Sequence, residues 1–431
     1  MTTFKRVLAL SGCMLLGATS VVQADTTQGS DVQAELSAMR SRIAQLEGQQ
    51  NQSWLNERRA EEVKSLVREV LSDADTRASL ADGGNTAHID STGIMISSED
   101  GRTWVRFNGQ IQTRWSYNAR EGDQIGTQDK NDGMFSTPRV KMMINGQVAD
   151  PRLTFHIQIA ANGNFDDFDL EEYTISYELA DGLTVWGGLA TVPVVRGDII
   201  DSSHTLAADR GLFETFYTPG RAQGLGVIYH AKDSMRLQAM VLDNASIEFG
   251  LAGRAEFKVS GEWDQLEDFN AWSGEGQLLV LGLGGTYFEG AHGVQDGFNY
   301  ATIGVADVAY ENNGLGLYFA AAASNSKSSS GTYQTYGLTA QGNYMIVADK
   351  FEGFARYDYI DRTDGPSDIN LLTFGVNYYL NKHAAKFTFD MQYAPRPVTF
   401  TPFGSDLNID NAAGDGNRNQ VTFRAQFQLL F

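Results

Sequence analysis

The residues that most often do chemistry are sparse in this chain. Six histidines are scattered, and none stands at a spacing that would build a Ser-His-Asp or a metal site. One dense acidic cluster, residues 166–172, could hold a cation, although a solvated loop rim is the simpler interpretation. We therefore predict no catalytic residues, no bound metal and no cofactor, and hence no enzyme.

Charged residues that alternate with apolar ones indicate another kind of chemistry. In residues 103–118, Phe107 and Ile111 share one face of an extended strand. Several such strands could close into a barrel around a water-filled pore. If the apolar face of every strand points outward, the face that lines the pore carries more basic than acidic side chains, which favours the passage of anions. The alternative, that these charges pair off and leave weak selectivity, stays open. The predicted pore-wall residues are Arg106, Arg114, Arg139, Lys141, Arg152, Arg236, Arg254, Lys258, Arg356 and Arg424.

Residues 192–220 form an unusually long and apolar connection. A loop of this length in a compact fold is usually functional or disordered, and a freely solvated loop would not carry so many Val, Ile, Leu and Phe residues. We expect it to fold into a barrel and narrow it; an outside loop packed on its neighbours or on a subunit contact is the alternative. The predicted pore-constriction residues are Arg196, Asp198, Asp201, Asp209, Arg210, Glu214 and Arg221.

The end of the chain shows which element would position these side chains. Residues 419–431 alternate strictly, with Val421, Phe423, Phe427 and Phe431 on the apolar face. Such a strand lies on a core in a soluble protein, but it faces lipid in an outer-membrane barrel. The mean hydropathy is slightly negative, and outside the N-terminus no apolar run approaches the ~18 residues that a spanning helix needs. A net charge of −20 makes nucleic acid an improbable partner.

The same alternation predicts an all-β fold, a 16-stranded antiparallel transmembrane β-barrel. Short turns at one rim alternate with long polar loops at the other, as in up-and-down barrels. Residues 261–276 are an exception at the short-turn rim and suggest an error in our register. All eight prolines are expected outside strand interiors, with Pro138 opening a strand. The strands are expected at 103–118, 138–150, 152–162, 168–179, 183–191, 221–231, 235–243, 251–260, 277–288, 299–311, 315–325, 332–347, 351–362, 368–381, 385–394 and 418–431.

Three regions precede or make up this architecture. Residues 1–24 are predicted to be a signal peptide, with Lys5 and Arg6 before an apolar stretch and Ala24 at the cleavage site. A lipidated Cys13 and an uncleaved anchor helix are the alternatives. Residues 25–84 are predicted to be helical, with a two-heptad seam from Val32 that indicates a coiled coil in the periplasm or a single packed helix. Residues 85–431 are the barrel domain.

A set of short motifs surrounds the long connection and ends the chain: Trp186-Gly187-Gly188-Leu189, Asp209-Arg210, Pro219-Gly220-Arg221, Gly224, Gly226 and the terminal Phe431. In these residues the barrel region resembles the phosphate-selective porins O and P. The resemblance spans about residues 102–431 and is strongest over residues 183–229. It implies a sixteen-stranded trimeric porin whose third external loop folds inward, with an anion path of arginines and constriction lysines. This chain departs from that pattern, because residues 192–220 contain no lysine but three aspartates and a glutamate.

These features together predict a passive porin in a Gram-negative outer membrane. Its expected partners are membrane lipid, small ions and solutes, and two further copies in a homotrimer, with peptidoglycan a candidate partner of the periplasmic helices. Phe431 is the expected signal for membrane insertion. The alternative function is an envelope-tethering structural protein that uses the barrel as its anchor.

Overall fold

The computed structural model describes residues 41–42, 86–90, 93–120, 130–161, 168–244, 247–290, 298–328, 331–362, 368–395 and 420–431. The chain divides into two compact units, Met1–Ser79 and Leu80–Phe431. Ser41 and Arg42 are helical. The predicted signal peptide, Cys13 and the rest of the predicted coiled coil lie outside the described residues. No helix in the described ranges is long and apolar enough to cross a membrane.

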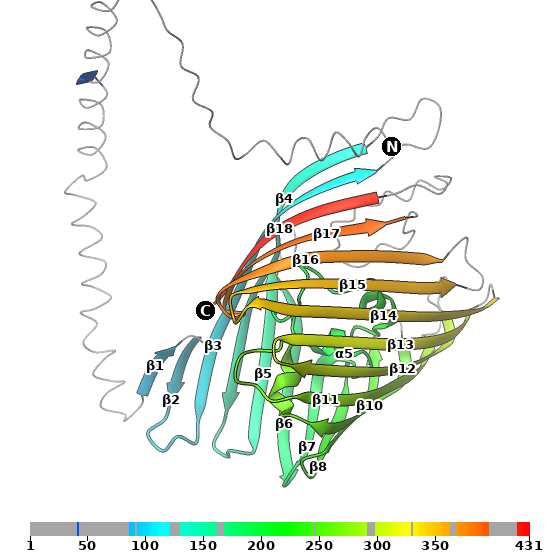
Figure 1. Ribbon diagram of the computed structural model, residues 1–431. Coiled ribbons are helices and arrows are strands. Elements are labelled where there is room, and N and C mark those ends of the chain that lie inside the picture. Colours follow the sequence, from blue (N-terminus) through cyan, green and yellow to red (C-terminus); the bar gives the residue numbers. More distant parts are fainter. Residues whose placement is uncertain are drawn as a thin grey trace, which may run out of the picture. The chain divides into compact units, whose positions relative to one another are not determined.

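The second unit is a closed antiparallel barrel of sixteen strands, β3 to β18 (Figure 1). Each strand pairs with the next, and β18 pairs with β3 from Gln420↔Arg120 to Leu430↔Gln110, which closes the ring. The predicted fold class is confirmed. The strands are β3 (Trp104–Arg120), β4 (Lys130–Gln147), β5 (Leu153–Ala161), β6 (Phe168–Ala180), β7 (Leu183–Thr191), β8 (Arg221–Ala231), β9 (Met235–Asn244), β10 (Ile247–Ser260), β11 (Leu278–Gly290), β12 (Phe298–Asn312), β13 (Leu315–Ser328), β14 (Gly331–Val347), β15 (Phe351–Arg362), β16 (Ile369–Asn381), β17 (Ala385–Ala394) and β18 (Gln420–Leu430).

Strand alternation separates an apolar outer face from an inner face that carries most of the barrel's polar side chains. Large apolar side chains on the outer face are exposed, among them Phe135, Ile175 and Leu225. The short connections at one rim use left-handed residues such as Asn313 and Gly314, with φ of 49° and 84°. Both central residues of a tight two-residue hairpin turn need such φ values, which explains the Asn-Gly pair there.

Two details differ from the expectations. Pro138 lies inside β4 rather than at its start, because β4 begins at Lys130. The β3–β4 register shifts between Gln112 and Arg114, opposite Pro138, and a bulge accommodates a residue that has no N–H to donate. A hairpin of β1 (Thr86–Asp90) and β2 (Gly93–Ser97) precedes the barrel and pairs with the start of β3, and the sequence reasoning missed it.

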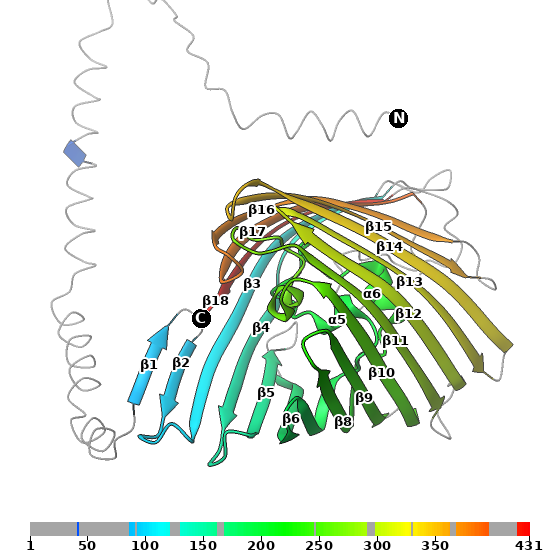
Figure 2. The same cartoon turned by 60° about the horizontal axis from the view of Figure 1, so that its bottom comes forward.

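The interior of the barrel holds two segments that are not strands. Residues 192–220 contain the short helices α5 (Arg196–Ile199) and α6 (Leu212–Tyr217), which lie inside the ring of strands (Figure 2). Residues 261–277 contain the 3₁₀ helix η1 (Trp263–Glu267) and connect β10 to β11. The exceptional connection at the short-turn rim is therefore real, and the strand order around it is as predicted.

Candidate functional site

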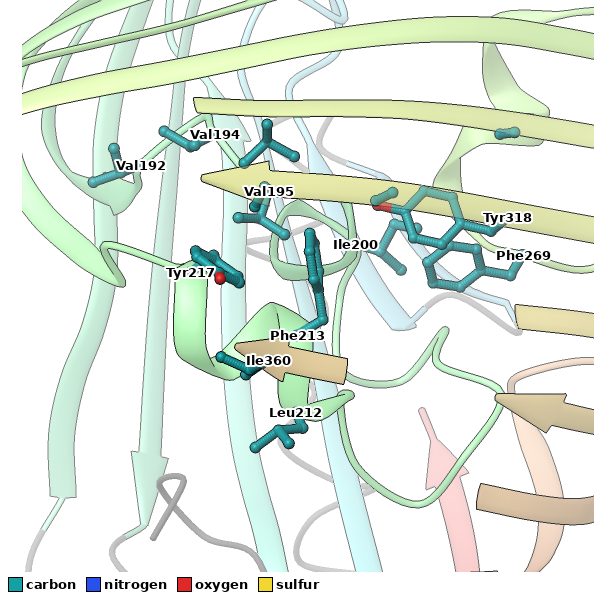
Figure 3. Close-up of a cluster of buried hydrophobic side chains, with 14 of the residues drawn as sticks. Val192, Val194, Val195, Ile200, Leu212, Phe213, Tyr217, Phe269, Tyr318 and Ile360 are labelled. Carbon is teal, nitrogen blue, oxygen red and sulfur yellow. The ribbon is translucent and has the colours of Figure 1, made fainter. Parts of the chain in front are cut away.

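The inner loop, residues 192–220, rests on an apolar part of the inner wall. Five apolar residues of the loop are fully buried and belong to one cluster (Figure 3): Val192, Val194, Val195, Phe213 and Tyr217. Wall residues from β9 to β16 complete this cluster, which explains why so apolar a connection is stable in a polar lumen. The wall members include Met240, Leu242, Phe288, Val305, Tyr318, Phe354, Ile360, Ile369 and Leu371.

Asp209 is the main polar attachment of the inner loop. Arg114 of β3 donates to both of its carboxylate oxygens, at 2.7 and 2.9 Å, and Arg424 of β18 donates at 2.8 Å. Arg139 of β4 adds a longer contact of 3.3 Å. Burial alone would raise the pKa of Asp209. The charges of the three guanidinium groups outweigh this effect and lower the pKa below its ordinary value, so the carboxylate stays charged. Such buried, bidentate pairs fix geometry more than they attract solutes.

Further inner-wall side chains hold the backbone of the loop. Asp390 accepts from the Ala208 N–H at 2.9 Å, and Asp358 accepts from the Leu212 N–H at 3.2 Å. Other wall groups donate to loop carbonyls and satisfy backbone acceptors that the loop's irregular conformation would otherwise leave unpaired. They are Arg254 to Val194, Gln428 to Ser203, Lys386 to Thr205 and Asn377 to Leu206, at 2.7–3.0 Å.

The inner wall is accordingly divided into two parts by exposure. Inward side chains in the middle of β3 and in β14–β18, such as Arg114, Arg356, Thr373, Lys386 and Arg424, are at most 9% exposed because the inner loop and residues 261–277 cover them. We call this part the covered wall. Inward side chains of β4–β7, apart from Lys141, Gln158 and Ala160, remain partly exposed, as does Arg221 at the start of β8, and we call this part the accessible wall. Its members include Arg139, Asn145, Gln147, Thr154, His156, Glu172, Thr174, Ser176, Thr184 and Trp186.

The accessible wall carries paired charges of both signs. Lys141 lies 2.7 Å from Glu171, and Arg221 at the start of β8 donates to Glu172 at 2.7 Å and lies 3.7 Å from Glu171. Glu171 and Glu172, which belong to the acidic cluster noted in the sequence, therefore form ion pairs with wall cations. In the described ranges, no group of three or more His, Cys, Asp or Glu residues could hold a metal ion.

The loop contributes its own partly exposed charges, Asp198, Asp201 and Arg210. Burial raises the pKa of Asp201, but Lys141 and hydrogen bonds from Ser203 outweigh this effect and lower it to about 2. Arg210 donates to the carbonyls of Gly197, Asp198 and Ile200, at 2.8–3.0 Å, and so stabilises the turn around α5.

The predicted constriction residues thus fall into two groups. Asp198, Asp201, Arg210 and Arg221 are partly exposed, whereas Arg196, Asp209 and Glu214 are buried. Glu214 sits beside Asp358 and Arg356, and burial together with the Asp358 charge raises its pKa to about 7.

The predicted pore-wall residues are similarly divided. Arg114, Arg254, Arg356 and Arg424 are buried in ion pairs, and Arg254 bridges Glu256 and Asp307 at 2.8–2.9 Å. Arg236 and Lys258 lie under the Trp263 ring, near the short-turn rim. Arg106 pairs with Asp90 of β1 at 3.3 Å. Arg152 lies in the turn before β5, where it pairs with Asp150 at 2.8 Å and its guanidinium lies over the Tyr177 ring.

Comparison with known proteins shows which solved structures share this barrel fold. No protein-family model and no curated protein matches the chain. An anion-selective porin from Comamonas acidovorans superposes with a TM-score of 0.56 at 14% identity, over 76% of this chain and 100% of that one. OmpT, an outer membrane protein of Vibrio cholerae, gives 0.51 at 14% identity over 76% and 98%. Salmonella typhi OmpF, in complex with daunomycin, gives 0.50 at 14% identity over 80% and 100%.

The first of these proteins is an anion-selective porin and the second is an outer membrane protein, and at such low identity the likenesses concern the fold alone. None of them supports the narrower resemblance to the phosphate-selective porins O and P. The chain therefore has the barrel fold of outer-membrane porins.

Proposed function

We propose that this protein is an outer-membrane porin, a passive water-filled channel for small hydrophilic solutes. The observation that carries the proposal is the division of the inner wall, where two inserted segments cover one side and leave a polar side accessible from β4 to β7. The apolar outer face suits the hydrocarbon core of a bilayer. Solutes pass between the inner loop and the accessible wall, and selection is by size and by charge.

The proposed constriction combines Asp198, Asp201 and Arg210 of the loop with Lys141 and Arg221 of the wall. Each basic group in this set has an acidic neighbour, at 2.7 Å for Lys141 and for Arg221 and at 3.4 Å for Arg210. Because paired charges produce weaker long-range fields than rings of one sign, we propose weak ion selectivity. The anion preference expected from the arginine-rich wall is correspondingly small, since half of its eight arginines are buried in ion pairs.

We also propose a homotrimer in the outer membrane of a Gram-negative cell, with residues 25–84 in the periplasm. The terminal Phe431 acts in insertion. Its N–H and carbonyl pair with Gly109 at 3.1 and 2.6 Å, so the last residue of the chain takes part in barrel closure. Peptidoglycan remains the proposed partner of the N-terminal helices.

Planar-bilayer recording of the purified protein tests the function. We expect stable conductance steps in groups of three, and in a salt gradient a reversal potential that corresponds to a permeability ratio within about threefold of unity. Protein unfolded by heat before reconstitution is the control. Correctly folded protein that inserts but stays silent would contradict the porin proposal and favour the envelope-tethering function.

A further inference from the structure

Residues 261–277 differ from the other described connections at the short-turn rim. Those connections, at 148–152, 181–182, 232–234, 313–314, 348–350 and 382–384, run for two to five residues. The connection from β10 to β11 is far longer, and it contains four large apolar residues at intervals of three, Trp263, Leu266, Phe269 and Trp272. A rim turn that lay in water would gain nothing from these side chains.

The middle of this segment is buried inside the barrel. Leu266, Asp268, Phe269, Asn270 and Trp272 are 0–9% exposed. The exposed residues lie near the two ends, at Glu262, Asp264, Glu267 and residues 273–274 and 276–277. The segment therefore enters the lumen from the short-turn rim and returns to it. We call it the lower insert.

The lower insert crosses from its own strands to the covered wall. At one end Trp263 donates to the Asp233 carbonyl in the β8–β9 turn, at 3.1 Å. At its centre the Asn270 side chain donates to both oxygens of Glu352 on β15, at 2.9 Å, and lies 2.8 Å from the Tyr379 hydroxyl on β16. This span occupies the lumen beside β13 to β17.

Close packing shows that the insert is seated on the wall rather than resting loosely near it. The Phe269 carbonyl oxygen would come within 2.6 Å of a Cβ at Gly316 of β13, so only glycine fits there. The Phe269 ring centre lies 5.1 Å from the Tyr318 ring centre. Figure 3 shows the two rings next to each other. The Trp272 ring lies 4.9 Å from the Tyr379 ring.

The lower insert also touches the inner loop, which enters from the opposite rim. Arg196 of α5 donates to the Asp268 carbonyl at 3.1 Å, and its guanidinium lies 5.6 Å from the centre of the Phe269 ring. Arg196 is 3% exposed, so the contact is closed to water. The buried Arg196 that was predicted for the constriction therefore joins the two inserted segments.

A second contact between the two segments runs through His383. Burial and the Lys386 charge lower the pKa of His383 to about 3, so the ring is neutral. Its Nε2 then donates to Asp268 at 2.9 Å, and its Nδ1 faces the Lys386 ammonium at 3.4 Å. Lys386 in turn donates to the Thr205 carbonyl of the loop at 2.7 Å. One continuous buried network thus links Asp268 to the loop.

We propose that the lower insert is a second constricting element. It positions the inner loop from the side of the short-turn rim and confines the path of solutes to the accessible wall. The positioning residues are Asn270 and Asp268 of the insert and Arg196 of the inner loop. The inference rests on the proposed porin function. It adds that two segments from opposite rims, rather than the loop alone, determine the width of the path.

The direct test replaces residues 261–277 with a two-residue Asn-Gly turn, which matches the other connections at that rim. We expect single-channel conductance to rise about twofold and larger neutral polyethylene glycols to enter the pore, because pore cross-section controls both. Stable channels with unchanged conductance and an unchanged size limit would overturn this inference while leaving the porin function intact. Folded protein that forms no channels would instead contradict the porin function itself.

Asn270→Ala keeps the inference testable if the replacement does not fold. The matched control is Asn343→Ala on β14, because Asn343 also donates to Glu352, at 2.8 Å, but from the wall. We expect Asn270→Ala to raise conductance and open-channel noise, and Asn343→Ala to leave both near wild type. Equal behaviour of the two variants would show that only the wall network matters, and would overturn the role of the insert.

Discussion

The covered wall and the accessible wall are built from the same kinds of residue, yet these residues have different roles. On the covered wall Arg114, Arg424 and Asp209 form a buried cluster that attaches the inner loop. On the accessible wall Arg221 and Glu172 form a pair of similar length, but both side chains are more than a fifth exposed. Coverage by other parts of the chain, rather than residue type, decides which charges can meet a solute.

Removing a charge from the two walls should therefore have different consequences. A buried charge that loses its partner leaves an uncompensated ion in a low-dielectric site, which costs about 3–5 kcal/mol. An exposed charge that loses its partner is solvated by water and mainly changes the local potential. The predictions below test this distinction, beginning with the largest expected effect.

Asp209→Ala should be the most damaging single substitution. It leaves the guanidinium groups of Arg114 and Arg424 without the carboxylate that they share, and we expect the inner loop to detach from the covered wall. Conductance should rise, and the temperature at which the folded gel band disappears should fall by roughly 10 °C. Asp198→Ala, on the same loop but partly exposed, is the matched control for stability and should lower that temperature only slightly. Similar thermal loss in both variants would remove the distinction between the walls.

Gly109→Leu tests the closure of the barrel, where β3 meets β18. A Cβ at Gly109 would lie 2.4 Å from the Phe431 ring, so the ring must move away from the closing strand pair. We expect reduced amounts of the protein in the outer membrane, by about threefold, with normal conductance of the channels that do insert. Gly304→Leu is the control, because a Cβ there meets no atom within 4 Å. Normal membrane levels of Gly109→Leu would contradict the role of Phe431.

Much of the barrel could be predicted from the sequence because each strand carries its own signal. Alternation over nine or more residues identifies a strand and its inner face without knowledge of any partner. The short strands β1 and β2 were missed, since five residues each give too little alternation, and Pro138 was misplaced because a bulge is a property of a strand pair.

The site was harder to predict because burial in the lumen depends on contacts between distant residues. Arg114 and Asp209 are 95 positions apart, and Arg424 and Asp209 are 215 apart. Nothing local distinguishes these arginines from Arg221. The lower insert, in contrast, did carry a signal, since its Trp, Leu and Phe residues fail the same solubility criterion that singled out residues 192–220.

Arg221→Gln should change ion selectivity with little effect on stability. It removes the positive partner of Glu172 and the more distant of the two positive neighbours of Glu171, so the negative charge of Glu172 acts on passing ions. We expect the reversal potential in a salt gradient to shift toward cation preference, with the permeability ratio changing about twofold. Lys386→Met, on the covered wall and 2% exposed, should leave the reversal potential unchanged. A larger shift in Lys386→Met than in Arg221→Gln would reverse the assignment of the two walls.

Glu214 should produce the smallest effect, and one that depends on pH. It is buried beside Asp358 and Arg356, with Arg210 nearby, and its pKa in the folded protein is about 7 against an ordinary value of 4.5. The folded state therefore holds this proton more tightly than the unfolded chain, so stability is lost as pH rises from 4.5 through 7. Wild type should lose its folded gel band at a lower temperature at pH 8 than at pH 5, and Glu214→Gln should lose part of that dependence. Thr215→Val, a neighbouring change that leaves every carboxylate in place, should keep it. An identical pH dependence in wild type and Glu214→Gln would show that this carboxyl titrates as it does in water, and that the loop around α6 does not shield it.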